Sequence, residues 1–150
     1  MADVPLDPEE ERFWRALQRV MVMLPKALDD DLVRSTGLTL SEYVVLMHLS
    51  EAADRELRVT DLASLSALSV SRISRVVDAL TKRGWVRKRR PAEDARGSVA
   101  CLTAEGFGRL EAAYPFLLSS ARRRVMDHVG DDLISPLADQ LEGVVNHLGE

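Results

Sequence analysis

Apolar residues recur every three or four positions through much of the chain, which is the spacing of one face of an α-helix. In the first segment they fall at Phe13, Leu17, Val20, Leu24, Leu28 and Leu32. Asp7 followed by Pro8 is typical of a helix N-terminus, and Gly37 is typical of a helix end. The pattern predicts one long helix between them. Pro25 predicts a kink or break within it, because proline removes a backbone donor.

The middle of the chain contains shorter helical segments. Thr39 begins a helix that extends to about residue 52, and residues 53–57 form a polar loop. Thr60 then begins a short helix, which residues 68–70 separate from a further helix that ends at Gly84. Apolar residues of this last helix lie on one face, at Ile73, Val76, Val77 and Leu80. Two short helices joined by a turn of a few residues indicate a helix-turn-helix.

After Gly84 the pattern changes from helical spacing to that of strands. WVRKRR and SVACLT are strand-like, and the turn-rich segment PAEDARG lies between them. This arrangement is typical of a β-hairpin with a long tip. We therefore predict a basic wing beside the helix-turn-helix.

The last third of the chain predicts two more helices. The first begins at Thr103, has Pro115 as a predicted irregularity, and ends at Gly130. Its stripe comprises Leu110, Tyr114, Leu117, Ala121 and Val125. The second, in which Ser135-Pro136 predicts a restart, has a stripe of Leu133, Leu137, Leu141, Val144 and Leu148. These stripes predict either self-association as a two-fold dimer or helices that fold back on the core of their own chain.

The predicted fold class is mainly α with a small β-hairpin wing, a winged helix-turn-helix with long terminal dimerisation helices. Residues 1–36 form the N-terminal dimerisation helix. Residues 37–103 form the winged helix-turn-helix, and residues 104–150 form the C-terminal dimerisation helices.

Charge is unevenly distributed along the chain. The formal net charge is −4, yet residues 72–96 contain nine Lys or Arg against three Asp or Glu, a net charge of +6. Such segregation can create a local positive potential that attracts polyanions, although a solvated basic surface gives the same count. Charge by itself therefore leaves a nucleic-acid surface and a solvated surface both open.

Composition narrows the class of protein. With 46% hydrophobic and 29% charged residues and no apolar run near 20 residues, the chain predicts an ordinary globular protein without membrane insertion. The N-terminus has no signal-peptide pattern, so we expect a cytoplasmic protein. Phosphate loops, HExxH and nucleophile elbows are absent from the sequence, so we expect no enzyme and no cofactor.

Several adjacent motifs resemble the MarR family of bacterial transcriptional regulators. They are LSVSRISRVVDALTKRGWVRKR at 68–89, the Asp94-Ala95-Arg96 triplet of the hairpin, and Leu102-Thr103-Ala104-Glu105-Gly106 at the next helix start. LTLSEYVVLMHLS (38–50) and DLASL (61–65) match more loosely. The resemblance implies a homodimer with interlocked terminal helices, a winged helix-turn-helix in each protomer, and DNA binding that a small ligand or oxidant often weakens.

The recognition helix of such a protein enters the major groove with its N-terminal part. The expected DNA-contacting residues of this helix are Ser71, Arg72, Ser74 and Arg75. Each arginine can read guanine, contact phosphate or remain solvated, and the serine hydroxyls suit phosphate or base edges. Val70 and Ile73 are expected to pack inside. We predict a sequence-specific regulator, most simply a repressor, on a pseudo-palindromic operator.

The basic hairpin supplies the other expected DNA contacts. They are Arg87, Lys88, Arg89 and Arg90 at the phosphate backbone, and Arg96 in the minor groove. Because side chains alternate along a strand, only some of the first four can face phosphate together. The family pattern implies that Asp94 orients Arg96 or a basic strand residue. A merely solvated hairpin is the alternative.

The family resemblance also implies an apolar crevice for a small aromatic or phenolic anion. Candidate lining residues are Trp14, Met21, Tyr43, Met47, His48 and Tyr114, each of which could equally be a core residue. Cys101, the single cysteine, leaves an oxidant-sensing regulator open as an alternative. His48, His128 and His147 form no metal-binding motif, so no metal is expected. A winged-helix module that binds protein instead of DNA is the remaining alternative.

Overall fold

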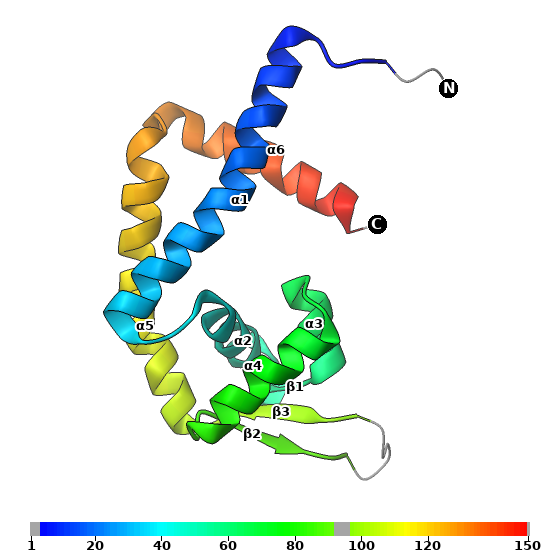
Figure 1. Ribbon diagram of the computed structural model, residues 1–150, viewed down its shortest axis with the longest axis vertical. Coiled ribbons are helices and arrows are strands. Elements are labelled where there is room, and N and C mark those ends of the chain that lie inside the picture. The colour runs from blue at the N-terminus through cyan, green and yellow to red at the C-terminus, as the bar shows by residue number, and fades with distance from the viewer. Residues whose placement is uncertain (1–3, 92–96, 150) are drawn as a thin grey trace.

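The computed structural model describes residues 4–91 and 97–149, which fold into a winged lobe and a helical arm (Figure 1). The α-helices are α1 (Pro8–Thr36), α2 (Leu40–Glu51), α3 (Val59–Ser66), α4 (Val70–Lys82), α5 (Ala104–Arg124) and α6 (Asp131–Leu148). The strands are β1 (Glu56–Arg58), β2 (Val86–Arg89) and β3 (Val99–Leu102), and two 3-10 turns are η1 (Ala53–Arg55) and η2 (Met126–His128). The lobe comprises α2, α3, α4 and the sheet, and the arm comprises α1, α5 and α6.

Side-chain caps begin the long helices where the sequence predicted. Asp7 accepts hydrogen bonds from the backbone N–H groups of Glu9 and Glu10, both at 2.8 Å, and Glu10 accepts one from the N–H of Asp7 at 2.9 Å. Thr39 and Thr103 cap α2 and α5 in the same manner. The predicted starts of these three helices are therefore confirmed.

Three prolines lie inside helices without interrupting them. Pro25, Pro115 and Pro136 belong to uninterrupted α1, α5 and α6, so a break at Pro25 and a restart at Pro136 are wrong, while a kink at Pro25 and an irregularity at Pro115 remain predictions. All three are exposed, so water can reach the backbone carbonyls that lose a partner. The actual interruption is at Val125, whose φ of −128° and ψ of −62° end α5.

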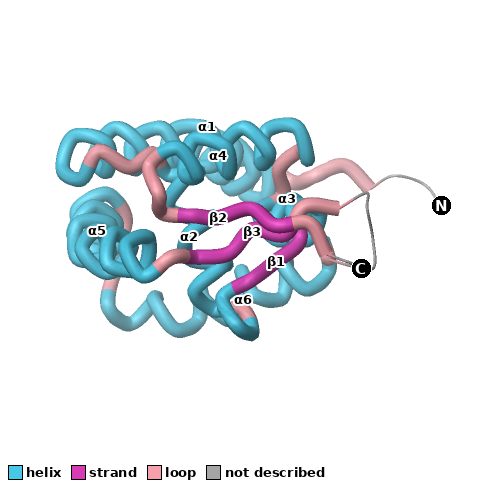
Figure 2. Tube along the Cα trace, turned by 90° about the horizontal axis from the view of Figure 1, so that it is seen from below, coloured by secondary structure: helices cyan, strands magenta, loops and turns pink. Residues whose placement is uncertain are grey.

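A short strand completes the sheet. The strand order is β1-β3-β2, with both pairs antiparallel and β3 in the middle, as seen in Figure 2. Residues 56 and 57 therefore belong to β1, and the predicted polar loop at 53–57 is wrong at its end. The strand that pairs with β1 lies more than 40 residues later in the chain, so the local sequence gives little indication of a strand at 56–58.

The start of α3 also differs from the prediction. The helix begins at Val59, and Thr60 is its second residue instead of its cap. The N–H of Val59 donates to the carbonyl of Ser98 at 3.0 Å, so the backbone of the hairpin satisfies the first helical donor. A tertiary hydrogen bond replaces the side-chain cap.

The core of the lobe is formed by α2, α3, α4 and one face of the sheet, and it includes Leu32 of α1 and Leu110 and Ala113 of α5. Fully buried side chains include Leu38, Val45, Leu46, Leu49, Leu62, Ile73, Val77, Leu80 and Val86. Trp85 crosses close to the start of α5, where a Cβ on Gly106 would lie 2.1 Å from the Trp85 carbonyl oxygen. Glycine is thus required at this position of the Leu-Thr-x-x-Gly motif.

The arm contrasts with the lobe in its exposure. In α6, all of whose residues are described, no residue is buried, and Leu133, Leu137, Leu141, Val144 and Leu148 are exposed. Large apolar side chains of α1 are exposed as well, among them Phe13, Val20, Met21 and Met23. These side chains do not fold back on a core of their own chain. Within residues 4–91 and 97–149, none of the helices has the length and hydropathy to cross a bilayer.

Candidate nucleic-acid interface

Helix α4 is anchored on one face and exposed on the other. Ile73, Val77 and Leu80 are fully buried, and Ser69 caps the helix by accepting from the N–H of Arg72 at 3.2 Å. Arg72 and Arg75 lie on the exposed side. Val70 is 49% exposed, so the expectation that it packs inside is wrong: it precedes the first buried turn.

The four polar residues expected to contact DNA lie along the first two turns of α4. Ser71 and Ser69 place their hydroxyl oxygens 3.2 Å apart. Arg72 Nη2 donates weakly to Ser41 Oγ of α2 at 3.4 Å. Ser74 lines a hollow of about 170 Å³ between the starts of α3 and α4 and the hairpin, and Lys88 lines the same hollow. The structure therefore brings the N-terminal part of α4 and the hairpin together.

The basic residues of β2 divide between the two faces of the sheet. Arg87 is paired with Cys101 and Arg89 with Val99, so both face away from the lobe's core. Lys88 is paired with Ala100, a core residue, and therefore lies on the face that packs against the helices. Alternation along the strand thus separates them, as predicted, and Arg90 follows the strand as an exposed residue.

Two acidic residues hold this hairpin in place. Lys88 Nζ forms an ion pair with Asp78 of α4, and Arg89 forms one with Glu56 of β1. The hydrogen bond from Arg89 holds the pKa of Glu56 below its usual range. Sequence reasoning missed both acids as hairpin partners, because each comes from a different element. For Glu56, the alternation of polar and apolar residues at 56–58 was the one feature of the sequence that could have indicated a strand.

The tip of the hairpin includes two predicted site residues, Asp94 and Arg96. Both lie outside the described residues, which end at Pro91 and resume at Gly97. Their assigned roles, minor-groove insertion for Arg96 and wing support for Asp94, remain predictions. The hairpin contacts that the structure does describe are those of β2.

A groove of about 1080 Å³ lies between α1, α2 and α4, with the last residue of α3 also in its lining. Its cationic side chains are Lys26, Arg72 and Arg75, and its apolar side chains are Pro25, Leu40, Val44, Leu68, Val76 and Ala79. The hydroxyl of Ser66, another lining residue, is buried without a hydrogen-bond partner. Two acids, Asp29 and Glu42, also line the groove, and they accept hydrogen bonds from the N–H of Leu40 and from Arg83. The arginines expected to contact DNA therefore also line a groove in which three cations and two hydrogen-bonded carboxylates lie beside an apolar surface.

The six residues predicted to line a ligand crevice do not line this groove. Tyr43 is a core residue at 4% exposure, Met47 packs against the core, and His48 is half-buried. Burial raises the pKa of Tyr43, with a smaller contribution from nearby Tyr114. Trp14, Met21 and Tyr114 are exposed on the arm, where Trp14 lines a separate shallow hollow. Sequence reasoning missed the groove because its lining comes from four helices.

Thiol and metal chemistry find little support in the described residues. Cys101 is buried in β3, and its pKa is raised, first by burial and then by its hydrogen bond to Glu56. A raised pKa keeps the thiol protonated and therefore unreactive toward oxidants. Across residues 4–91 and 97–149, no three His, Cys, Asp or Glu side chains converge to hold a metal ion.

Comparisons with known proteins agree on one family. A model of the MarR family matches residues 36–97, from the end of α1 into the hairpin. The HTH-type transcriptional repressor YetL of Bacillus subtilis (strain 168) is 32% identical over 109 residues. That match covers 71% of this chain and spans 65% of the length of YetL.

Solved structures extend the likeness over the whole chain. Sco3205, a MarR family transcriptional regulator from Streptomyces coelicolor solved in complex with DNA, is 32% identical with a TM-score of 0.88, covering 99% of this chain and 93% of its own. CouR from Rhodococcus jostii RHA1, solved bound to p-coumaroyl-CoA, is 25% identical with a TM-score of 0.72, covering 86% of this chain and 88% of its own. With its winged fold and its likeness to Sco3205 over nearly all of both chains, the protein belongs to the MarR family.

Proposed function

We propose that this protein is a cytoplasmic transcriptional repressor that binds a pseudo-palindromic operator as a homodimer and leaves it when a small aromatic or phenolic anion binds. The proposal is for regulation of transcription and not for catalysis. Helix α4 would enter the major groove, while the β2–β3 hairpin would follow the flanking backbone.

The observation that carries the proposal is the placement of Arg72 and Arg75. Both are exposed on a helix whose opposite face is fully buried, so the lobe holds them in a fixed direction. A guanidinium can grip guanine O6 and N7 through two hydrogen bonds. The likeness to Sco3205, which was solved with DNA, supports DNA binding by this chain.

A homodimer would cover the apolar surface of the arm. The exposed leucines and valines of α6 and the exposed apolar residues of α1 need a partner, and a second copy offers the same surface. Two recognition helices related by a two-fold axis would reach half-sites about 10 base pairs apart. The operator would therefore be a pseudo-palindrome.

The groove between α1, α2 and α4 is our candidate for the ligand site. Lys26, Arg72 and Arg75 would hold the anionic group, and Leu40, Val44 and Val76 would contact the apolar body. A ligand that engages Arg72 there would compete with DNA for the same side chain. It would shift the equilibrium only as far as it prefers the DNA-free conformation.

Binding to the intergenic DNA upstream of its own gene tests the main proposal. Gel shifts and footprinting should reveal a protected two-fold site. If each protomer neutralises about four phosphates, log K should fall with log salt with a slope near −7, at roughly −0.9 per contact. A salt-insensitive interaction, or no protected site, would contradict DNA binding and favour a protein-binding winged helix.

The ligand is tested separately, on the same complex. Benzoate, p-coumarate and p-coumaroyl-CoA are suitable probes because each combines an anion with an aromatic ring. Release of DNA by one of them, lost in Lys26→Ala, would support the groove. Release that persists in Lys26→Ala, but is lost in Tyr114→Ala, would instead favour the crevice predicted from the sequence.

A further inference from the structure

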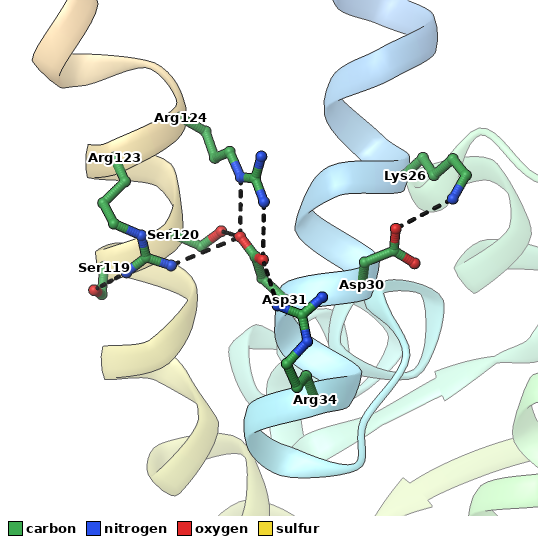
Figure 3. Close-up of polar contacts among 8 residues, drawn as sticks. All are labelled: Lys26, Asp30, Asp31, Arg34, Ser119, Ser120, Arg123 and Arg124. Carbon is green, nitrogen blue, oxygen red and sulfur yellow. Dashed lines mark hydrogen bonds and ion pairs between the residues drawn. The ribbon is translucent and has the colours of Figure 1, made fainter.

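Three consecutive acids near the end of α1 make three different contacts. Asp30 is exposed and forms an ion pair with Lys26 of its own helix at 3.1 Å. Asp31 is buried at the crossing of α1 and α5 (Figure 3). Asp29 contacts the start of α2. Solvation therefore explains one of the three acids.

Asp31 joins α1 to α5. Its carboxylate accepts a hydrogen bond from Ser120 Oγ at 2.5 Å and two from Arg124, from Nε and Nη2, each at 3.0 Å (Figure 3). Arg34 and Arg123 lie at 3.8 and 3.7 Å. The hydrogen bond from Arg124, followed by that from Ser120, holds the pKa of Asp31 well below its usual range. The joint is a bidentate ion pair with a further hydroxyl donor.

Asp29 joins the same helix to the lobe. Its Oδ1 accepts from the backbone N–H of Leu40 at 2.7 Å, at the positive end of α2. Residues two positions apart on a helix point about 200° apart around its axis. Asp29 and Asp31 therefore hold α1 from nearly opposite sides, one toward α2 and the other toward α5.

A second ion pair continues from α2 to the end of α4. Arg83, directly after α4, donates to Glu42 Oε2 of α2 at 3.2 Å and to the carbonyl of Gly37 at 3.4 Å. The Glu42 side chain is only 10% exposed. Polar contacts thus run from α5 through α1 and α2 to the recognition helix, over segments far apart in the sequence.

We propose that Asp29 and Asp31 are positioning residues that fix the orientation of recognition helix α4 relative to the arm. The chain enters the lobe from α1 and leaves it into α5, so these two helices are the covalent connections between arm and lobe. A joint that holds α1 to α5 on one side and to α2 on the other sets the angle at which the lobe leaves the arm. The functional consequence, the spacing of two recognition helices on DNA, rests on the proposed function.

The orientation can be measured within one chain by spin labels. Arg12→Cys on the arm and Lys82→Cys at the end of α4, both exposed positions, carry the labels in a Cys101→Ser background. Labelled protein is diluted with unlabelled protein, so the measured distance lies within one chain whatever the oligomeric state. Asp31→Asn and Asp29→Asn should each broaden or shift the distance distribution. Asp30→Asn, the matched control, should leave it as in the wild type.

Coincident distributions for the wild type, Asp30→Asn and Asp31→Asn would overturn the proposal and reduce Asp31 to a contributor to stability. Should Asp31→Asn fail to fold by circular dichroism, Ser120→Ala removes one hydrogen bond of the same joint and gives the same readout. On operator DNA, Asp31→Asn should lose affinity by roughly 2- to 30-fold while remaining a dimer. If the wild type binds no DNA, the proposed function fails, and the distance measurement still decides the positioning role.

Discussion

Leucines in the helices of the winged lobe differ in exposure from leucines in α6 of the helical arm. Leu46, Leu62 and Leu80 of the lobe are 0% exposed, whereas Leu137 and Leu141 of α6 are 41% and 50% exposed. All five of these leucines lie in α-helices, and of these helices α3, α4 and α6 are amphipathic. The difference teaches that an apolar stripe indicates a face that will be covered, but does not say which chain covers it.

The lobe and the crossing of α1 with α5 also differ in where their polar contacts lie. In the lobe, polar contacts such as Glu42–Arg83 lie at the edge of an apolar core. Where α1 crosses α5, the buried contact is itself polar, with Asp31 at its centre. The arm helices α1 and α5 thus combine apolar packing against the lobe, through Leu32 and Leu110, with directional polar contacts and, as we propose, with a second copy.

The largest expected effect is loss of the dimer through substitutions in α6, with the lobe still folded. Leu137→Asp combined with Leu141→Asp should weaken the proposed dimer by at least about 1,000-fold, because each leucine that a second copy covers would contribute about 1.5–3 kcal/mol in each protomer. Sedimentation velocity measures the oligomeric state, and circular dichroism should show an intact lobe. Asp139→Asn, on the same helix, is the matched control. A double variant that still sediments as a dimer would mean that α6 lies outside the interface.

A smaller effect is expected in the core of the lobe. Leu46→Ala should lower the free energy of unfolding by about 2–5 kcal/mol, since it leaves a cavity in a fully buried site. Val70→Ala, at a half-exposed site of the same lobe, should change it by no more than about 0.5 kcal/mol. Urea unfolding at one fixed protein concentration measures both. Equal losses from the two variants would contradict the assignment of the core.

In the proposed complex with DNA, α4 and the hairpin should contribute differently to sequence specificity. Arg75→Ala should cost about 1–3 kcal/mol on the operator and less on unrelated DNA, because it removes a base contact. Lys88→Ala, in the hairpin beside Asp78, should weaken binding to both DNAs alike. Titration of each variant against operator and scrambled duplex at one salt concentration gives the comparison. Identical ratios for the two variants would contradict the division of roles.

The smallest effect is the acid dependence of the joint at Asp31. Its pKa is lowered in the folded state by Arg124 and Ser120, so its contribution to stability is complete above the unfolded pKa near 4 and is lost as the pH falls further. The difference in urea midpoint between wild type and Asp31→Asn should therefore be constant from about pH 7 to pH 5 and shrink below about pH 4. Asp30→Asn provides the control. A difference that grows in acid would contradict the ion pair.

Features that depend on neighbouring residues were predictable from the sequence. The caps at Asp7, Thr39 and Thr103 and the buried face of α4 follow from residues within one or two turns. The β2–β3 hairpin follows from alternation on either side of a turn-rich segment. On the candidate site, the exposure of Arg72 and Arg75 follows from the same helical period.

Features that depend on distant segments were missed. Strand β1 is too short to recognise without its partner β3, and the groove beside Arg72 is assembled from four helices. Cys101 is buried and paired with Glu56 and Arg87 from two other strands, and burial raises the pKa of its thiol.

Local periodicity and capping were sufficient to define most of the helices, the hairpin and the exposure of Arg72 and Arg75, because these follow from interactions over a few residues. The partners of those elements were decided by packing. Asp29, Asp30 and Asp31 are chemically identical and consecutive, yet one caps α2, one faces solvent and one is buried against α5. Their roles differ because the helix turns by about 100° per residue, and only the fold specifies what lies in each direction.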